Sequence, residues 1–581
     1  MGVFILFCLL INTVALPQER DKISPQLLDL IKENSGEIYT AWVYFKDKGP
    51  YKTHRLQKAR DSLSIRSKNR RLRHGFKVLV DEYDLSVYRP YLESVKKYAT
   101  KVRLTSRWLN AVSLEVQGND VQKIADFPFV KKIEKVKVYS FRKPTPPPSV
   151  EVVAVPPEAE LHVHDYGPSF NQVEQMNVPV LHDMGYNGQG ILICMLDSGF
   201  NNLNHQALDH LDIVATWDFV NQDAFVFDEE GQMGTGDHGT NTLGAIGGYR
   251  SGELIGPAFG ASFILGKTEN TEWERHMEED HWVAGAEWAD SLGADIISSS
   301  LGYRNQFTHG ESDYNSEDMD GETTVVAQGA NIAASRGILI VNSAGNEGAA
   351  QPPDNTIISP ADSPWVLAAG AVDPQGDRVD FSSTGPTADG RIKPDVMAQG
   401  SSVYTAHPEE SDGYEYTSGT SFSCPLTAGV AALILEMNPT WTNQDIMDAL
   451  KLTSKKANDP DNRYGYGIIN AFKAARFTLK SIHAPDSFAL QRMENNYGFF
   501  VQYVDQLSWE SDQRNNGRVS SYRIYAKSLQ GLQNFFVLIR EVNHNVFSFA
   551  RRGLLEDETF LYKIVSVDKS GKESDPTYTR W

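Results

Sequence analysis

The sequence predicts an α/β domain with a central parallel sheet flanked by helices, placed between an α+β unit and a C-terminal β-sandwich. Between about residues 165 and 480, short apolar runs that end in Gly or polar residues alternate with helix-like stretches. The preceding unit mixes strand-like and helix-like segments, and the last part alternates apolar and polar residues. A chain of 581 residues is also too long for one core, so we expect several folding units.

The N-terminal residues predict a secretory signal peptide at 1–16. The apolar stretch from Val3 to Leu16 is too short to span a bilayer, and Thr13 and Ala15 provide a small-x-small cleavage site. No Lys or Arg precedes the apolar stretch, which departs from the usual signal pattern. A buried N-terminal segment is the alternative. We therefore expect a secreted, extracellular protein without a transmembrane anchor.

Residues 22–141 form the first predicted unit. Apolar and aromatic runs at 41–45 and 108–116 are typical of strands, and the spacing at 53–80 and 87–99 is compatible with helices. Residues 1–150 contain 28 basic and 15 acidic residues, whereas the rest of the chain contains 27 basic and 60 acidic ones. Because their net charges are opposite, we expect the two parts to attract each other.

Nucleic-acid binding is the alternative interpretation of the basic unit. The cluster Arg70, Arg71 and Arg73 is compatible with it. No nucleic-acid-binding motif surrounds these residues, however, and a secreted protein rarely meets nucleic acid. We therefore expect no nucleic-acid partner.

The remaining boundaries follow changes in composition. A Pro-rich stretch at 142–164 reads as an extended linker. Residues 165–480 form the α/β domain, in which the alternation of apolar runs and helix-like stretches indicates parallel βαβ units. Residues 484–581 predict a β-sandwich that resembles a fibronectin type III domain, with Trp509 and Tyr562 as candidate core residues.

Two cysteines, Cys194 and Cys424, follow the signal peptide. A secreted protein with so few cysteines is not held together by disulfides. Both residues lie in apolar runs, so we expect buried free thiols. A single bridge between them is the alternative that the sequence leaves open.

A nucleophile candidate, Ser421, follows Gly419 and Thr420 in the run GTSFSCP and begins a helix-like stretch. At a helix N-terminus, its backbone N–H can point toward a developing oxyanion. Pro425 falls in the first turn, where its missing N–H costs little. An ordinary helix cap is the alternative for this Ser when it is taken alone.

Three further polar residues complete a set suited to acyl transfer. His238 in DHGTN can accept the Ser421 proton, and Asp197 in LDSG ends a buried strand, where its carboxylate can hold the imidazole. Asp237 is adjacent in sequence, but it lacks that fixed position. Asn346 in AGNEG ends another apolar run, and its amide can donate to an oxyanion. Carboxyl ends of parallel strands meet at one edge of a sheet, so we expect these groups to lie together.

These runs resemble those of the subtilisin-like serine proteases, the subtilases of the peptidase S8 family. The similarity covers about 310 residues and includes LDSG, DHGT, SSSLG, AGNEG, FSSTGPTADGRIKPD, GTSFSCP and YGYGIINAFKAA. It implies a subtilisin-like fold and a secreted serine endopeptidase that works through an acyl-enzyme. It also implies that Asp197, His238 and Ser421 are the catalytic triad and that Asn346 is the oxyanion-hole side chain.

The resemblance extends to substrate and propeptide. It implies a strand that pairs with the polypeptide substrate, formed by Ser300, Leu301 and Gly302. It implies one wall of the primary specificity pocket at Ala344 and Gly345. The basic first unit is similar to the family's inhibitory pro-domain, which makes the protein a zymogen with its own pro-domain as intramolecular inhibitor. We expect the processing cut within residues 141–168, and a C-terminal domain that contacts substrate or a surface.

Two features depart from the common family pattern. Ser423 and Cys424 stand where Ala and Ser are more usual, which suggests an activity sensitive to thiol reagents. An acidic insertion follows the substrate strand, and Asp313, Asp318 and Asp320 are its candidate calcium ligands. A solvated acidic loop is the favoured interpretation, although structural calcium is common among subtilases. The chemistry itself requires no cofactor. A His-x-His-Asp run at 162–165 fits a linker better than a metal site.

Two other functional classes compete with this interpretation. One is a catalytically silent binding protein on the same scaffold, which a complete Asp, His and Ser set argues against. The other is a serine esterase or lipase, which places its Ser in a G-x-S-x-G turn and follows the order Ser, Asp, His. Here the order is Asp, His, Ser, and GTSFS lacks the second Gly. Substrate preference stays open, although Glu347 beside Asn346 suggests a basic side chain in the primary pocket.

Overall fold

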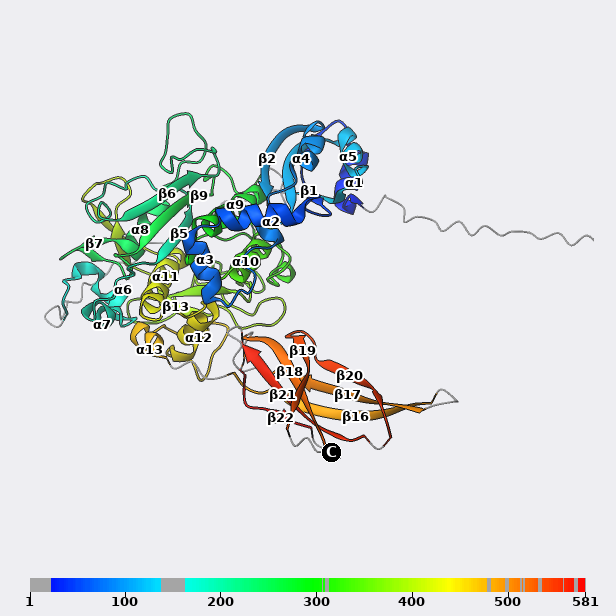
Figure 1. The fold of residues 1–581 in the computed structure, drawn as a ribbon. Coiled ribbons are helices and arrows are strands. Elements are labelled where there is room, and N and C mark those ends of the chain that lie inside the picture. The colour runs from blue at the N-terminus through cyan, green and yellow to red at the C-terminus, as the bar shows by residue number, and fades with distance from the viewer. Residues whose placement is uncertain are drawn as a thin grey trace, which may run out of the picture.

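The structure is a computed structural model of the chain. It describes residues 22–136, 162–305, 307–308, 313–477, 482–496, 501–512, 515, 518–530, 535–556, 558–568 and 573–579. The expected signal peptide and most of the expected linker lie outside these residues. Figure 1 shows the blue N-terminal unit, the middle region from cyan to yellow, and the orange to red C-terminal region.

The N-terminal unit contains an antiparallel sheet with strand order β2-β3-β1-β4. Its strands are β1 (Ile38–Phe45), β2 (Ala99–Ser106), β3 (Ala111–Gln117) and β4 (Val130–Lys135). Side chains alternate between the two faces of β1. Val43 joins a core beneath α1 (Pro25–Glu33), α4 (Arg89–Lys96) and α5 (Gly118–Ala125), whereas Trp42 and Tyr44 face the other way. The sheet therefore has a second apolar face with which to dock.

The helical stretch expected at 53–80 is two helices, α2 (Lys52–Ser62) and α3 (Ile65–Arg73). The chain breaks at Leu63, which is extended, and Ser64 then caps α3 by accepting a hydrogen bond from the Ser67 N–H. This break lets α3 leave the sheet and lie against the middle region, as Figure 1 shows.

The middle region contains a seven-stranded sheet in which every neighbouring pair is parallel, with strand order β13-β12-β11-β10-β5-β9-β6. Its strands are β5 (Leu192–Asp197), β6 (Asp212–Asp218), β9 (Ser262–Lys267), β10 (Ile296–Ser299), β11 (Leu339–Ser343), β12 (Val366–Val372) and β13 (Val396–Gln399). The predicted parallel sheet is thus confirmed. Residues of β5, β10, β11, β12 and β13 are buried throughout, which explains their continuous apolar runs.

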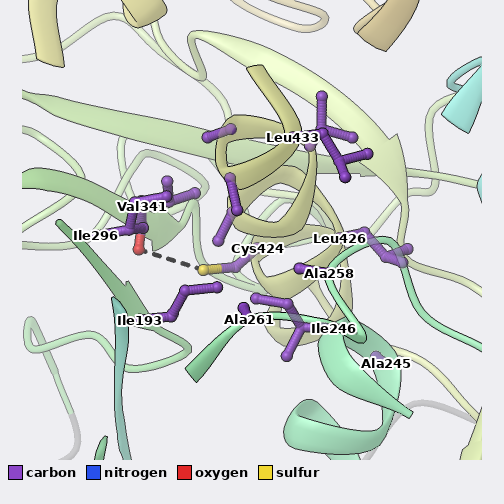
Figure 2. Close-up of a cluster of buried hydrophobic side chains, with 14 of the residues drawn as sticks. Ile193, Ala245, Ile246, Ala258, Ala261, Ile296, Val341, Cys424, Leu426 and Leu433 are labelled. Atoms are coloured by element: carbon purple, nitrogen blue, oxygen red, sulfur yellow. Dashed lines mark hydrogen bonds between the residues drawn. The ribbon is translucent and has the colours of Figure 1, made fainter. Parts of the chain in front are cut away.

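Helices cover both faces of this sheet. On one face lie α8 (His238–Gly247) and α11 (Thr420–Met437), and on the other lie α9 (His276–Leu292) and α10 (Val325–Ser335). Figure 2 shows the first core, in which Ile193, Ile296 and Val341 from the strands face Ile246 from α8 and Leu433 from α11. Among the described helices, α11 is long and apolar enough to cross a membrane, but 83% of it is buried, as expected for a core helix.

Shorter elements complete the first two regions. The helices are η2 (Glu82–Asp84), η4 (Gly167–Ser169), α6 (Phe170–Glu174), α7 (Val178–Asp183), η5 (Ser316–Asp318), α12 (Asn443–Thr453) and α13 (Ala471–Ala475). The strands are β7 (Tyr249–Arg250), β8 (Leu254–Ile255), β14 (Val403–Ala406) and β15 (Tyr414–Thr417).

The sheet order places a switch point between β5 and β10. From β5 the chain continues to β6 and β9 on one side, then returns to β10 on the other side. Connections from neighbouring strands therefore diverge here, and the carboxyl ends of such strands are where ligands bind in open α/β sheets. Asp197 ends β5, and Ser300 directly follows β10.

The C-terminal region consists of two antiparallel sheets with strand orders β16-β17-β20 and β19-β18-β21-β22. The strands are β16 (Asp486–Asn496), β17 (Val501–Glu510), β18 (Val519–Ser528), β19 (Val537–Asn543), β20 (Ser548–Leu554), β21 (Phe560–Asp568) and β22 (Thr577–Tyr578). Side chains of both sheets share one core, to which Trp509 and Tyr562 belong. The predicted β-sandwich and its two core residues are confirmed.

Candidate active site

Asp197 lies fully buried at the end of β5 and accepts three hydrogen bonds. The donors to Oδ1 are the Ser198 backbone N–H at 2.8 Å and His238 Nδ1 at 2.7 Å. The donor to Oδ2 is the Thr242 hydroxyl at 2.9 Å. A carboxylate buried without such partners would be costly, so this arrangement fixes an ionised group in one orientation.

His238 is the first residue of α8, and its side chain is 35% exposed. Because a carboxylate only accepts hydrogen bonds, the Nδ1 atom facing Asp197 carries the proton, and Nε2 of the neutral ring is the acceptor. Burial by itself lowers the pKa of His238, but the charge of Asp197 and the hydrogen bond to it outweigh burial and raise the pKa. The imidazole thus donates to Asp197 through Nδ1 and can accept a proton at Nε2.

Ser421 is the second residue of α11 and is half-buried. The ring of the next residue, Phe422, lies 5.7 Å from the His238 ring, measured between centroids. The Ser421 hydroxyl donates to the Ser300 carbonyl at 3.4 Å, and the Ser300 hydroxyl donates to the Ser421 carbonyl at 2.7 Å. The first turn of α11 is therefore tied to the chain that leaves β10.

Asn346 follows β11, and its amide is oriented by Thr420. Its Oδ1 accepts from the Thr420 backbone N–H at 2.9 Å and from the Thr420 hydroxyl at 3.1 Å. The Nδ2 donor consequently points the other way. A carbon added to Gly419 at the Cβ position would lie 3.7 Å from Asn346 Nδ2 and 3.7 Å from the Ser421 backbone nitrogen. Both donors thus border one small space that Gly419 leaves open.

Two strand ends flank this space. Leu301 follows Ser300, and its carbonyl accepts from Asn342 Nδ2 at 2.8 Å, which ties the end of β10 to β11. Ala344 is buried, and the Gly345 N–H donates to the Thr420 hydroxyl at 3.2 Å. Gly345 has φ +106°, a conformation that favours glycine. The segments that follow both strands thus contact the first turn of α11.

The acidic insertion uses its carboxylates within its own loop. Asp313 accepts from the Phe307 N–H, Asp318 from the Asn315 N–H, and Asp320 from two N–H groups and the Thr323 hydroxyl. Among the described residues, no three His, Cys, Asp or Glu side chains form a metal-binding group. These three carboxylates therefore do not fit a calcium cage, although calcium is common in subtilases.

His162 of the His-x-His-Asp run contacts Asp183 at 2.8 Å.

The thiol of Cys424, three residues after Ser421, is fully buried, and Figure 2 shows it within the core beside Val341. It donates to the carbonyls of Val341 at 3.3 Å and Ser299 at 3.4 Å, and burial raises its pKa to about 12. Cys194 is also buried and free. The expected free thiols are thus present, but the expected sensitivity to thiol reagents is not favoured, because a buried, protonated thiol reacts slowly.

Comparison with known proteins adds independent findings. A model of the subtilase family matches residues 188–467, and a model of the Bacteroidota peptidase S8 propeptide domain matches residues 40–149. Subtilisin amylosacchariticus from Bacillus subtilis subsp. amylosacchariticus is 31% identical over 336 residues, covering 57% of this chain and 76% of that protein. The subtilisin of Bacillus pumilus is 31% identical over 310 residues, covering 52% and 98%. Serine protease AprX of Bacillus subtilis (strain 168) is 31% identical over 308 residues, covering 49% and 66%.

The chain belongs to the subtilase family. It is a subtilisin-like serine endopeptidase that carries a propeptide domain. The fold agrees with this assignment, since the seven-stranded parallel sheet spans the matched region.

The propeptide of this subtilase docks on α9 through the second face of its sheet. The Trp42 indole donates to Asp280 at 2.7 Å, and the Ser113 hydroxyl donates to the same carboxylate at 3.0 Å. The Ser106 hydroxyl donates to Glu287 at 2.5 Å. These contacts set neutral donors of the propeptide against carboxylates of α9.

The α3 helix of the propeptide makes a second set of contacts with the subtilase domain. Arg70 and Arg71 are fully buried and both bind Asp290, which also binds Arg107 at 3.0 Å. Burial alone would raise the pKa of Asp290, but the three guanidinium groups hold it below its usual range. Arg70 and Arg71, which the sequence alone left compatible with nucleic-acid binding, thus bind Asp290 of the same chain.

Sequence reasoning missed two threonines of this subtilase site. Thr242 lies four residues after His238 and therefore on the same face of α8, which is a signal that could have found it. Thr420 holds the Asn346 amide, and its position between Gly419 and Ser421 is the corresponding signal. Threonine is too common a residue for either position to be distinctive by itself.

Proposed function

We propose that this subtilase is a secreted zymogen whose mature form cleaves polypeptides through a catalytic triad of Asp197, His238 and Ser421. The observation that carries the proposal is the 2.7 Å hydrogen bond from His238 Nδ1 to the buried Asp197. It leaves Nε2 as the acceptor of a ring that lies against Phe422, the residue next to Ser421.

The proposed chemistry follows the positions of these groups. The Ser421 oxygen attacks the scissile carbonyl carbon while His238 Nε2 takes the hydroxyl proton. The protonated imidazole then gives this proton to the leaving amine as the C–N bond breaks, and an acyl-enzyme ester remains. A water molecule attacks that ester with His238 again as base, which releases the acid and restores the Ser421 hydroxyl.

Two electrostatic effects stabilise the charges that develop. The oxyanion is proposed to sit in the space beside Gly419, where Asn346 Nδ2 and the Ser421 N–H can both donate. The imidazolium is stabilised by Asp197, in keeping with the raised pKa of His238. No metal or organic cofactor takes part in these steps.

Substrate is proposed to pair with the chain at Ser300, Leu301 and Gly302, with Ala344 and Gly345 as the opposite wall of the primary pocket. The support is geometric, because both segments leave neighbouring parallel strands and border Ser421. Backbone pairing of this kind gives affinity for extended peptides regardless of their sequence.

Residues 22–141 are proposed to act as an intramolecular inhibitor until the chain is cut within 141–168. The buried ion pairs on α9 support a stable association. A signal peptide at 1–16 would direct export, and 142–164 would serve as the linker to a catalytic domain at 165–480. The strand arrangement of 484–581 is compatible with a fibronectin type III-like domain, which is proposed to contact substrate or a surface.

Replacement of the nucleophile tests the proposal. Ser421→Ala should leave the fold intact and reduce peptide hydrolysis by about a million-fold, because the acyl-enzyme can no longer form. It should also leave the propeptide uncut, as judged by electrophoresis of the secreted protein. Ser423→Ala, two residues along α11, is the matched control and should retain activity. Substantial hydrolysis by Ser421→Ala would contradict the proposed role.

A further inference from the structure

The crevice beside Ser421 contains an unexpected side chain, that of Ile358. A methyl group added to Gly302 would overlap Cδ1 of Ile358, and one added to Gly345 would meet the same atom at 3.0 Å. The two glycines belong to the two segments that leave β10 and β11. Ile358 therefore fills the space between these strand ends, and it is only 8% exposed.

This space is where the residue before the scissile bond would place its side chain, if the proposed function is correct. A substrate strand paired along Ser300 to Gly302 brings its carbonyl to Ser421 and to Asn346. The side chain attached to that carbonyl then enters between Gly302 and Gly345. The inference rests on the proposed function in this respect.

The segment that carries Ile358 is held on both sides. On one side, the buried Arg304 donates to the Thr356 carbonyl at 3.0 Å, to the Thr356 hydroxyl at 2.8 Å and to the Pro353 carbonyl at 3.1 Å. On the other side, the Tyr303 N–H donates to the Ser359 carbonyl at 2.8 Å. These bonds fix the backbone on either side of Ile358, so its side chain can leave the space only by a change of rotamer.

Charge in this part of the site does not favour a basic substrate residue either. Glu347 follows Asn346, and burial raises its pKa while the charge of Arg304 opposes that rise. The negative charge of Glu347 is therefore partly balanced from within the protein, and Ile358 limits the length of any side chain that enters.

We propose that Ile358 closes the primary pocket and makes this subtilase specific for small residues, Gly, Ala or Ser, before the scissile bond. A larger side chain would have to displace a packed, anchored isoleucine. One methylene too many in such a pocket costs about 10- to 200-fold in kcat/KM, and a phenyl ring exceeds the space by several carbons.

The test uses the matured full-length enzyme and a series of peptides that differ only in the residue before the cleaved bond. We expect kcat/KM for Ala to exceed that for Phe, Leu and Arg by about a hundred-fold or more. In Ile358→Gly, the Phe peptide should gain at least about tenfold while the Ala peptide changes little. Ile358→Val keeps a branched side chain and is the matched control, so its preference should stay close to that of the unaltered enzyme.

The outcomes separate the two levels of the proposal. Preference of the unaltered enzyme for Phe, Leu or Arg would overturn the role of Ile358 while leaving the protease assignment intact. An unchanged Ala to Phe ratio in Ile358→Gly would also overturn it. If that variant does not fold, the profile of the unaltered enzyme and of Ile358→Ala decides. Failure to cleave any peptide in the series would instead contradict the proposed function.

Discussion

Two of the carboxylates that the subtilase domain buries, Asp197 and Asp290, are surrounded in opposite ways. Asp197 accepts from a backbone N–H, a threonine hydroxyl and one imidazole. Asp290 instead binds three guanidinium groups, all from the propeptide. Burial alone would raise the pKa of Asp290, but those permanent charges lower it.

The difference shows how one residue type would serve the proposed chemistry in one place and binding in the other. Around Asp197, the neutral partners fix the carboxylate without cancelling its charge, which remains available to a newly formed imidazolium. Around Asp290, the charge is fully matched before any reaction, which favours association and leaves nothing for catalysis. The same Asp→Asn substitution should therefore affect rate at one site and propeptide affinity at the other.

Among the aspartate substitutions, the largest effect is expected for Asp197→Asn. An amide cannot hold the His238 tautomer or stabilise the imidazolium, so kcat/KM should fall by about ten thousand-fold. His238 must be neutral to act as a base, so activity rises with pH through its raised pKa. Loss of the Asp197 charge should move that rising limb to lower pH in the residual activity. Initial rates from pH 5 to 9 measure both changes.

Asp237→Asn is the matched control for this substitution. Asp237 lies next to His238 in sequence, but its side chain makes no capping hydrogen bond to α8. We expect a small change in rate. A loss as large as that of Asp197→Asn would mean that the wrong carboxylate has been assigned to His238.

A smaller effect, on binding rather than rate, is expected for Asp290→Asn. The change removes the charge that Arg70, Arg71 and Arg107 share, although Arg71 keeps Asp84 and Arg107 keeps Glu287. Loss of one partner of a buried pair costs about 2–5 kcal/mol. The cut propeptide should then dissociate with a constant about 30-fold to several thousand-fold higher. Inhibition of the processed enzyme upon dilution measures this constant.

The control for Asp290→Asn is Glu93→Gln, which removes an exposed acid of the propeptide that pairs with Arg89. Its effect on inhibition should be negligible, because exposed pairs contribute little. Equal weakening by the two substitutions would show that net charge, not the Asp290 cluster, holds the propeptide.

The smallest expected effect is a pH dependence that originates at Asp280. Burial, as the main cause, raises its pKa to about 7 in the complex with the propeptide. Once Trp42 and Ser113 leave, the exposed carboxyl should return toward its usual value of about 4. The complex then holds a proton that the free enzyme releases, so the association is strongest at low pH and weakens as pH rises toward 7.

Between pH 5.5 and 7.5, the dissociation constant should thus increase by about tenfold or more. Asp280→Asn should reduce this slope, and the remainder would come from Glu287, whose pKa burial also raises. Measurements at both pH values on the unaltered and altered proteins test the sign. Tighter binding at the higher pH would contradict it.

Much of the fold and of the crevice could be predicted from the sequence because the strands end in distinctive residues. Asp197, Ser300 and Asn346 each directly end or follow an apolar run, and parallel strands bring such ends together. Thr242 and Thr420 act through single hydrogen bonds that any threonine could make. Arg70 and Arg71 look like a solvated basic cluster until the break at Leu63 turns α3 onto α9.

Ile358 could not be predicted for a different reason. It lies 56 positions after Gly302, outside any strand, and reaches the space between the strand ends because Arg304 and Tyr303 hold the chain on either side of it. Hydrophobic patterning predicts that such a residue is buried but not which space it fills. The acidic loop shows the converse, since its carboxylates resemble a set of calcium ligands in sequence but accept hydrogen bonds from the backbone of the loop.

The assignment of Ser421 as a nucleophile activated by His238 is tested most directly by a fluorophosphonate probe on the matured enzyme. Peptide mapping by mass spectrometry should find one adduct, on the Ser421 oxygen, with labelling greatly slowed in His238→Ala and absent in Ser421→Ala. Hydrolysis of peptides by an enzyme that carries no adduct at Ser421, or that is labelled at another residue, would contradict that assignment.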